Sequence, residues 1–365
     1  MFNLLEIKDP TFIKKLNMKE LEALAQDIRD FIIENVRVTG GHLASNLGVV
    51  EITIAMHYVF DSPNDMFLFD VGHQSYVHKI LTGRAKEFAT LRQLNGLSGY
   101  INKNESEHDI WESGHSSTSI SAQAGLISAL EHNNQSGRVI SLIGDSSIAN
   151  GIAFEGLNFL GQFQDKNPII ILNDNKMGIN RSVGAMNRFL NRLRGSKGWR
   201  RVHSAGQRVL PNWFMSFLHK TKRGIKAFVQ RDNIFEDLGF DYYGPYEGNK
   251  IRSLIKVLQC AKNSNTPCII HLITRKGQGY KPAEEKDSEV VVKADEKVKR
   301  SVIMTIMDAA QDAHYNKLIV AGEPLNKKDQ KKLEEASKAE TKNYTSNNLI
   351  EGATTPIPQD NQYEN

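Results

Sequence analysis

The sequence predicts an α/β fold of three layers, in which helices cover both faces of a mostly parallel sheet. Short apolar runs bounded by polar turns alternate with segments whose apolar residues recur at helical spacing. Two such runs, 138–143 and 169–172, flank a helical segment at 151–158, which is the order of a strand–helix–strand unit. The chain has 365 residues and is 40% hydrophobic, so it can bury a sizeable core.

The first helix is predicted from a start signal. Asn17 is a capping residue, and Glu20 stands three positions later, ahead of a helical repeat that stops before Gly40. The same kinds of pattern predict the other elements of the core. In chain order these are helix 47–60, strand 66–69, helix 120–130, strand 138–143, helix 151–158, strand 169–172, helix 251–261 and strand 268–273.

The composition changes after residue 283. We expect residues 1–283 to form one domain with a mobile basic insert at about 181–231, for which a phosphate-binding run is the alternative interpretation. The part that follows is more polar and has little periodicity. In chain order it consists of a charged linker at 284–297, a helical pattern that ends in a strand-like run at 298–322, and a disordered tail at 323–365.

Charge and composition exclude several classes of protein. Lys and Arg number 46 against 42 Asp and Glu, and the net charge of +4 is too small to indicate a nucleic-acid partner. No stretch approaches the ~20 apolar residues of a membrane span, and the apolar run at the start is too short for a secretory signal. Two cysteines do not make a disulfide framework. We therefore expect a cytoplasmic protein with no membrane or nucleic-acid partner.

Two polar turns follow neighbouring strands of the predicted sheet. Gly144, Asp145, Ser146 and Ser147 follow the first strand, and the second ends in an Asn-Asp-Asn turn that closes with Asn175. The carboxyl ends of parallel strands meet at one edge, where such folds bind ligands. A carboxylate and an amide oxygen there suit Mg²⁺ when a diphosphate and water supply its other ligands. A helix cap and a local turn are the alternative interpretation of these two side chains.

The spacing of the two turns resembles the thiamine diphosphate motif. Further motifs extend the likeness, so that roughly residues 10–285 resemble the amino-terminal, diphosphate-binding half of the 1-deoxy-D-xylulose-5-phosphate synthase family, which belongs to the transketolase group. The resemblance implies the three-layer thiamine diphosphate-binding fold. The motifs that carry it lie at 39–48, 70–84, 113–121 and 274–280.

The resemblance also implies the cofactors thiamine diphosphate and Mg²⁺. It gives Asp145, Asn175 and the carbonyl of Met177 as metal ligands. The family's active-site histidines correspond to His42, His73 and His115, whose imidazoles can move protons near neutral pH; a single histidine is more often structural. The cofactor-binding positions that it implies are Ser45, Gly114, His115, Ser116, Gly144, Asp145, Ser146, Ser147, Asn175 and Lys276.

The sequence departs from the family pattern at three positions. Ser146 replaces a glycine, which would let the backbone approach the diphosphate without a Cβ atom. Glu247 and Asn249 replace an aspartate and a histidine, and the sequence does not reveal what that changes.

The resemblance also implies that Lys276 pairs with the diphosphate, although spacing alone fits a surface lysine equally well.

The family's reaction joins pyruvate to the aldehyde of glyceraldehyde 3-phosphate, an aldose phosphate, with loss of CO₂, and gives 1-deoxy-D-xylulose 5-phosphate. In the family, the glutamate that activates the cofactor and the arginines that hold the phosphate lie on a second, pyrimidine-binding domain. Residues 298–322 resemble only the opening of that domain. We therefore expect a partner chain or a homodimer to complete the site. A subunit of a split transketolase with other substrates, and an inactive remnant or regulatory binding module, are the two alternatives.

Overall fold

The computed structural model describes residues 2–163, 166–175, 189–190 and 233–281, together with the backbone of 289–293 and 317–321. These residues fall into two compact units. The larger unit contains the whole of the described chain up to residue 281, and the smaller one contains the two last strands. The candidate site lies entirely within the larger unit.

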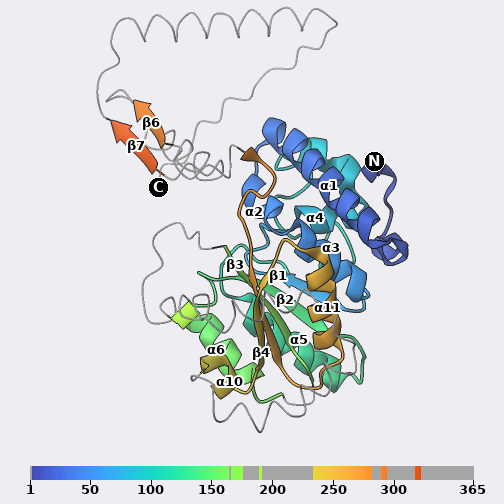
Figure 1. The fold of residues 1–365 in the computed structure, drawn as a ribbon, viewed down its shortest axis with the longest axis vertical. Coiled ribbons are helices and arrows are strands. Elements are labelled where there is room, and N and C mark those ends of the chain that lie inside the picture. Colours follow the sequence, from blue (N-terminus) through green and yellow to red (C-terminus); the bar gives the residue numbers. More distant parts are fainter. Residues whose placement is uncertain are drawn as a thin grey trace, which may run out of the picture. The chain divides into compact units, whose positions relative to one another are not determined.

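A parallel sheet of five strands forms the centre of the larger unit (Figure 1). The strand order is β1-β2-β3-β5-β4, and every neighbouring pair is parallel. The central strands are apolar and buried along nearly their whole length, as expected when helices cover both faces. The strands are β1 (Met66–Phe69), β2 (Val139–Gly144), β3 (Ile169–Asp174), β4 (Asp241–Glu247) and β5 (Cys268–Ile273).

Helices pack on both faces of this sheet, so the predicted three-layer α/β architecture is confirmed. One hydrophobic cluster joins α1, α3 and α11 to one face, and a second cluster joins α5 and α6 to the other. The α-helices of the larger unit are α1 (Met18–Thr39), α2 (Leu43–Leu47), α3 (Val50–Val59), α4 (Tyr76–Lys79), α5 (Ser119–His132), α6 (Gly151–Leu160), α10 (Ile234–Asp237) and α11 (Ile251–Lys262). Shorter helical turns lie at Leu4–Glu6, Pro10–Lys15, Ile80–Arg84 and Ala85–Thr90.

The start of α1 has the predicted capping box. The Asn17 side chain accepts hydrogen bonds from the backbone N–H groups of Lys19 and Glu20, and the Glu20 carboxylate accepts one from the Asn17 backbone. These bonds satisfy N–H groups that a helix start otherwise leaves unpaired. The helix ends at Gly40, whose positive φ of 73° favours glycine.

No helix in the described ranges is both long and apolar enough to cross a membrane.

Strand β4 was not predicted from the sequence, because Gly244 and Pro245 interrupt its pattern. In the structure β4 lies at the edge of the sheet, where a proline is tolerated although it has no N–H group to donate to a neighbouring strand. The register shifts between Tyr243 and Tyr246 as the strand passes these two residues. A Cβ atom at Gly244 would lie 2.6 Å from the carbonyl oxygen of His271, so this close approach of two strands requires glycine.

The smaller unit contains β6 (Glu289–Lys293) and β7 (Lys317–Ala321), which pair in parallel. The strand expected at the end of 298–322 is therefore present. The segment 284–297, expected to be a linker throughout, contains β6, so that prediction was wrong for residues 289–293. The basic insert, apart from residues 189–190, and the tail at 323–365 lie outside the described residues, and the assignment of 298–322 to a second domain stays a prediction.

Candidate active site

Several of the predicted site residues follow strands β1, β2, β3 and β5 at one edge of the sheet. Gly144 stands opposite Asn173 in the register, and the backbone N–H of Asp145 donates to the carbonyl of Asn173 at 3.1 Å. The two polar turns are therefore in direct backbone contact. This brings Asp145 and Asn175 to neighbouring strand ends, as the sequence predicted; Met177 lies outside the described residues.

The first two residues of the Asn-Asp-Asn turn are held inside the fold. The Asn173 amide oxygen accepts a bond of 2.6 Å from the Thr274 hydroxyl. The Asp174 carboxylate lies 2.8 Å from Nε2 of His271, whose Nδ1 lies 2.6 Å from the Tyr242 hydroxyl. All of these residues except Tyr242 are buried. Strand β5 thus fixes the backbone that carries Asn175, which is only partly buried.

His42 and His73 form a pair at the same edge of the sheet. Their ring centroids are 5.5 Å apart, and the rings meet edge to face. The hydroxyls of Tyr76 and Tyr100 each lie 3.4 Å from a ring nitrogen of His42. Burial, reinforced by the positive charges of His42 and Lys276, lowers the pKa of His73 to about 3. His73 is therefore neutral at neutral pH.

Sequence inspection alone gave no role to Asn249, and the structure supplies one. Its amide oxygen accepts from the backbone N–H of Arg275 at 3.0 Å, and its Nδ2 lies 3.3 Å from the Glu51 carboxylate. Glu51 is in turn ion-paired with Arg29. The same loop is also held by a bond of 2.9 Å from Gly277 N–H to the Ala44 carbonyl. Asn249 therefore helps to fix the loop that presents Lys276.

His115 lies in a separate loop at this edge. It is exposed, and its Nδ1 lies 2.7 Å from the Ser116 carbonyl oxygen. The loop is anchored by buried Asp70 at the end of β1, whose carboxylate accepts from the backbone N–H of Ser117 at 2.9 Å. Asn150, which follows the Asp145 turn, donates to the Ser117 hydroxyl at 2.6 Å. His42 and His73 are thus in ring contact, whereas His115 is presented from a different loop.

Space is available at the positions expected to border a diphosphate. A Cβ atom built at Gly114 or at Gly144 would meet nothing within 4 Å. Ser146, which stands where the family has glycine, is exposed, while its neighbour Ser147 is partly buried. Ser45 is partly buried on α2. The serine at position 146 therefore creates no conflict within the fold.

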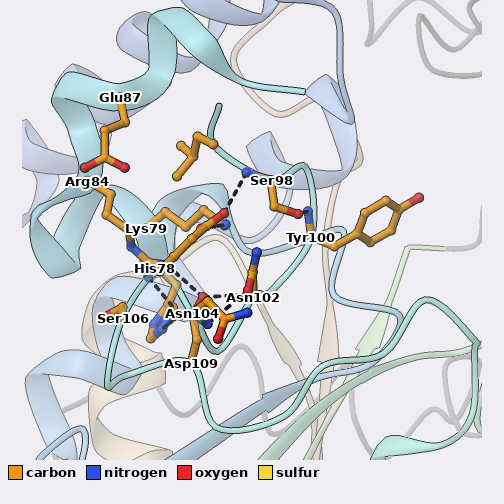
Figure 2. A network of polar contacts seen from close by, with 12 residues as sticks. His78, Lys79, Arg84, Glu87, Ser98, Tyr100, Asn102, Asn104, Ser106 and Asp109 are labelled. Atoms are coloured by element: carbon orange, nitrogen blue, oxygen red, sulfur yellow. Dashed lines mark hydrogen bonds and ion pairs between the residues drawn. The ribbon is translucent and has the colours of Figure 1, made fainter. Parts of the chain in front are cut away.

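A buried ionic network holds the loop that carries Tyr100 (Figure 2). Arg84 binds both carboxylate oxygens of Asp109, at 2.7 and 2.8 Å, and Lys79 is ion-paired with Glu105. Burial alone would raise the pKa of Asp109, but the contact of its carboxylate with Nε2 of His78 at 3.2 Å and the hydrogen bonds from Arg84 bring it well below its ordinary value. Figure 2 shows Tyr100 directed away from this network. The network thus gives the Tyr100 loop a rigid base.

Three buried histidines make folding stability depend on pH. Burial lowers the pKa values of His57, His73 and His78, so each stays neutral in the folded protein at a pH where the unfolded chain binds a proton. Stability should then fall as the pH drops below about 6.5, by about 1.4 kcal/mol per pH unit for each histidine. Urea unfolding at a series of pH values measures this slope. A free energy of unfolding that stays constant between neutral and mildly acidic pH would contradict it.

The residues at this edge fit a magnesium-bound diphosphate. Among the described residues, no group of three His, Cys, Asp or Glu side chains forms a metal cluster. A Mg²⁺ ion at Asp145 and Asn175 would take its remaining ligands from phosphate oxygens and water, which is how this ion usually binds. Nδ1 of His73 is buried and has no hydrogen-bond partner among the residues that the structure describes. An unsatisfied buried polar atom is consistent with a site that a polar ligand completes.

The matched family agrees with this geometry. A sequence profile described as 1-deoxy-D-xylulose-5-phosphate synthase matches residues 4–274. The chain belongs to this family. The synthase from Listeria innocua is 48% identical over 293 residues, which cover 77% of this chain and 45% of the relative. The synthase from Exiguobacterium sibiricum is 48% identical over 287 residues, which cover 77% of this chain and 46% of the relative. The chain thus spans about half the length of these synthases.

Solved structures support the fold. Transketolase from Campylobacter jejuni has a TM-score of 0.54 and 20% identity, over 72% of this chain and 39% of that one. Transketolase from Leishmania mexicana has a TM-score of 0.51 and 17% identity, over 71% of this chain and 37% of the transketolase chain. At this identity the likeness establishes a shared architecture only. The synthase family assignment therefore depends on the sequence relatives, and the transketolase likeness confirms the thiamine diphosphate-binding type of fold.

Proposed function

We propose that the chain provides the diphosphate-binding half of a thiamine diphosphate- and Mg²⁺-dependent 1-deoxy-D-xylulose-5-phosphate synthase. The reaction would join pyruvate to glyceraldehyde 3-phosphate and release CO₂. The observation that carries this proposal is the backbone contact between the Asp145 turn and the Asn175 turn, at the sheet edge that also holds the His42–His73 pair. A split transketolase is less well supported, because the close sequence relatives are synthases.

Each site residue would have a definite task. Asp145 and Asn175 would hold Mg²⁺, and Lys276 would neutralise the charge of the diphosphate. When bound, thiamine diphosphate supplies the carbanion that adds to a carbonyl group. His73 is neutral at neutral pH and would offer its unpartnered Nδ1 for a hydrogen bond to a substrate oxygen. His42, which the two tyrosine hydroxyls contact, would move a proton to or from that oxygen.

We further propose that catalysis needs a complementary half that binds the pyrimidine ring, supplied by a partner chain. Helix α6 follows the Asp145 turn directly and exposes apolar side chains, of which Ile152 is 52% and Phe159 46% exposed. Exposed apolar groups beside an active site favour association with another protein surface.

Both cysteines, Cys260 and Cys268, are free, which agrees with our proposal that the protein works in the reducing cytoplasm.

Reconstitution tests the function. The purified chain alone should give no 1-deoxy-D-xylulose 5-phosphate from pyruvate and glyceraldehyde 3-phosphate, because the glutamate that activates the cofactor belongs to the complementary half. Addition of the chain that co-purifies with it should restore turnover, measured as pyruvate-dependent CO₂ release. Product from the isolated chain would contradict the need for a complementary half. A complex that accepts ketose phosphates in place of pyruvate would favour the transketolase alternative.

A further inference from the structure

One buried side chain connects the two loops that carry His42 and His73. Asn46 lies on α2 and is fully buried. Its Nδ2 donates to the carbonyl of His42 at 2.7 Å and to the carbonyl of His73 at 2.9 Å. Its Oδ1 accepts from the backbone N–H of Tyr76 at 2.9 Å. A single amide thus joins both histidine backbones and the start of α4.

The loops need such a connection because local structure does not fix them. Helix α2 contains only five residues, far fewer than a helix needs to be stable by itself. The two histidines are 31 positions apart in the chain, so their separation depends on tertiary contacts. Tyr76 reinforces the link, because its hydroxyl accepts from the His42 backbone N–H at 3.2 Å. The tyrosine that Asn46 positions therefore contacts the same histidine.

Only an asparagine-like side chain satisfies this environment. The site presents two carbonyl oxygens and one N–H group, and an amide offers two donors and an acceptor in that arrangement. An aspartate has nearly the same shape but no donor, so it would place a carboxylate against two carbonyl oxygens. Alanine would leave all three backbone groups unpaired in the interior.

We propose that Asn46 is a positioning residue that sets the geometry of the His42–His73 pair. The proposal rests on the function proposed above for these histidines, and it predicts that Asn46 affects turnover through them. In the active complex, Asn46→Asp should lower kcat by about 10- to 100-fold, the usual effect of displacing a reacting group by about 1 Å. KM for pyruvate should change much less, because Asn46 itself is buried beneath the site.

The decisive readout is the titration of the histidine rings in the full-length chain, followed by NMR after labelling of the imidazole nitrogens. In the wild type, His73 should stay neutral throughout the range in which free histidine titrates. In Asn46→Asp the loop should open to water, and His73 should titrate close to the ordinary value of about 6.5. An unchanged His73 titration in folded Asn46→Asp would overturn the proposal.

Asn167 provides a matched control at the opposite end of the sheet. It too is a buried asparagine whose Nδ2 donates to two backbone carbonyls, those of Ala261 at 2.8 Å and Ser264 at 2.6 Å. Asn167→Asp should lower the melting temperature as Asn46→Asp does, yet leave the His73 titration and kcat unchanged. Equal effects of both variants on His73 would mean that Asn46 acts on general stability only and would overturn the proposal.

A second variant and a second readout cover the cases in which Asn46→Asp does not fold or the complex shows no turnover. If Asn46→Asp does not fold, Asn46→Ala removes the same three bonds without adding a charge, and the same shift in His73 is expected; an unchanged titration in this variant would equally overturn the proposal. If the wild-type complex shows no turnover, the proposed function fails, whereas the NMR comparison of Asn46 with Asn167 still decides whether Asn46 positions the histidines.

Discussion

Replacing Asp145 by alanine is expected to weaken the binding of Mg²⁺ and thiamine diphosphate to the complex by about 100-fold or more. The change removes the only carboxylate that the two polar turns place at the proposed metal position. Loss of an outer-shell partner of a metal site already costs about 10- to 100-fold in affinity, so loss of a direct ligand should cost at least the upper value. Calorimetric titration of the complex with thiamine diphosphate, with and without Mg²⁺, measures the effect.

Asp241→Ala is the matched control for this experiment. Asp241 is partly buried, as Asp145 is, but it begins β4 at the amino-terminal edge of the sheet, where it accepts a bond of 2.6 Å from the Thr266 hydroxyl. This variant should bind the cofactor as the wild type does. An Asp145→Ala complex that keeps its Mg²⁺-dependent affinity would remove Asp145 from the metal site.

Replacing Arg84 by methionine is expected to destabilise the larger unit by about 3–5 kcal/mol, the usual result of removing one partner of a buried ion pair. Arg84 is 4% exposed and neutralises Asp109, whose side chain is fully buried. Methionine keeps much of the volume but leaves that carboxylate without its bidentate partner. Urea unfolding at neutral pH measures the loss.

Lys14→Met serves as the comparison, because it breaks an ion pair at the surface. Lys14 and its partner Asp61 are 33% and 58% exposed, and such pairs contribute only about 0–1 kcal/mol. A similar small loss for Arg84→Met would show that the network of Figure 2 is not a source of stability. The Tyr100 loop would then need another anchor.

Local signals predicted most of the fold. The capping box at Asn17, the apolar runs of β1, β2, β3 and β5, and the helical repeats all lie within a few residues of the observed elements. Strand β4 could not be found in this way, because the edge position that accommodates Pro245 is a property of the whole sheet. Strand β6 lies in a charged stretch, and its pairing with β7 spans a long separation that no local pattern records.

The candidate site was predictable where chemistry and strand ends coincide. Asp145 and Asn175 follow apolar runs, and the parallel sheet brings such ends together. The roles of Asn46 and Asn249 could not be predicted, because each acts by bonding backbone groups of loops distant in the sequence. A motif readily identifies a residue that contacts a ligand. It seldom identifies the residue that holds such a ligand-contacting residue in place.

The Asn-Asp-Asn turn has one more consequence. Since Thr274 and His271 immobilise its first two side chains, the backbone at Asn175 is ordered before any ion arrives. A preorganised ligand loses little conformational entropy on binding. The described part of this turn should therefore need no folding step before metal and cofactor bind, so the fraction of sites that are occupied should depend mainly on how much of the organic ring the complementary surface encloses.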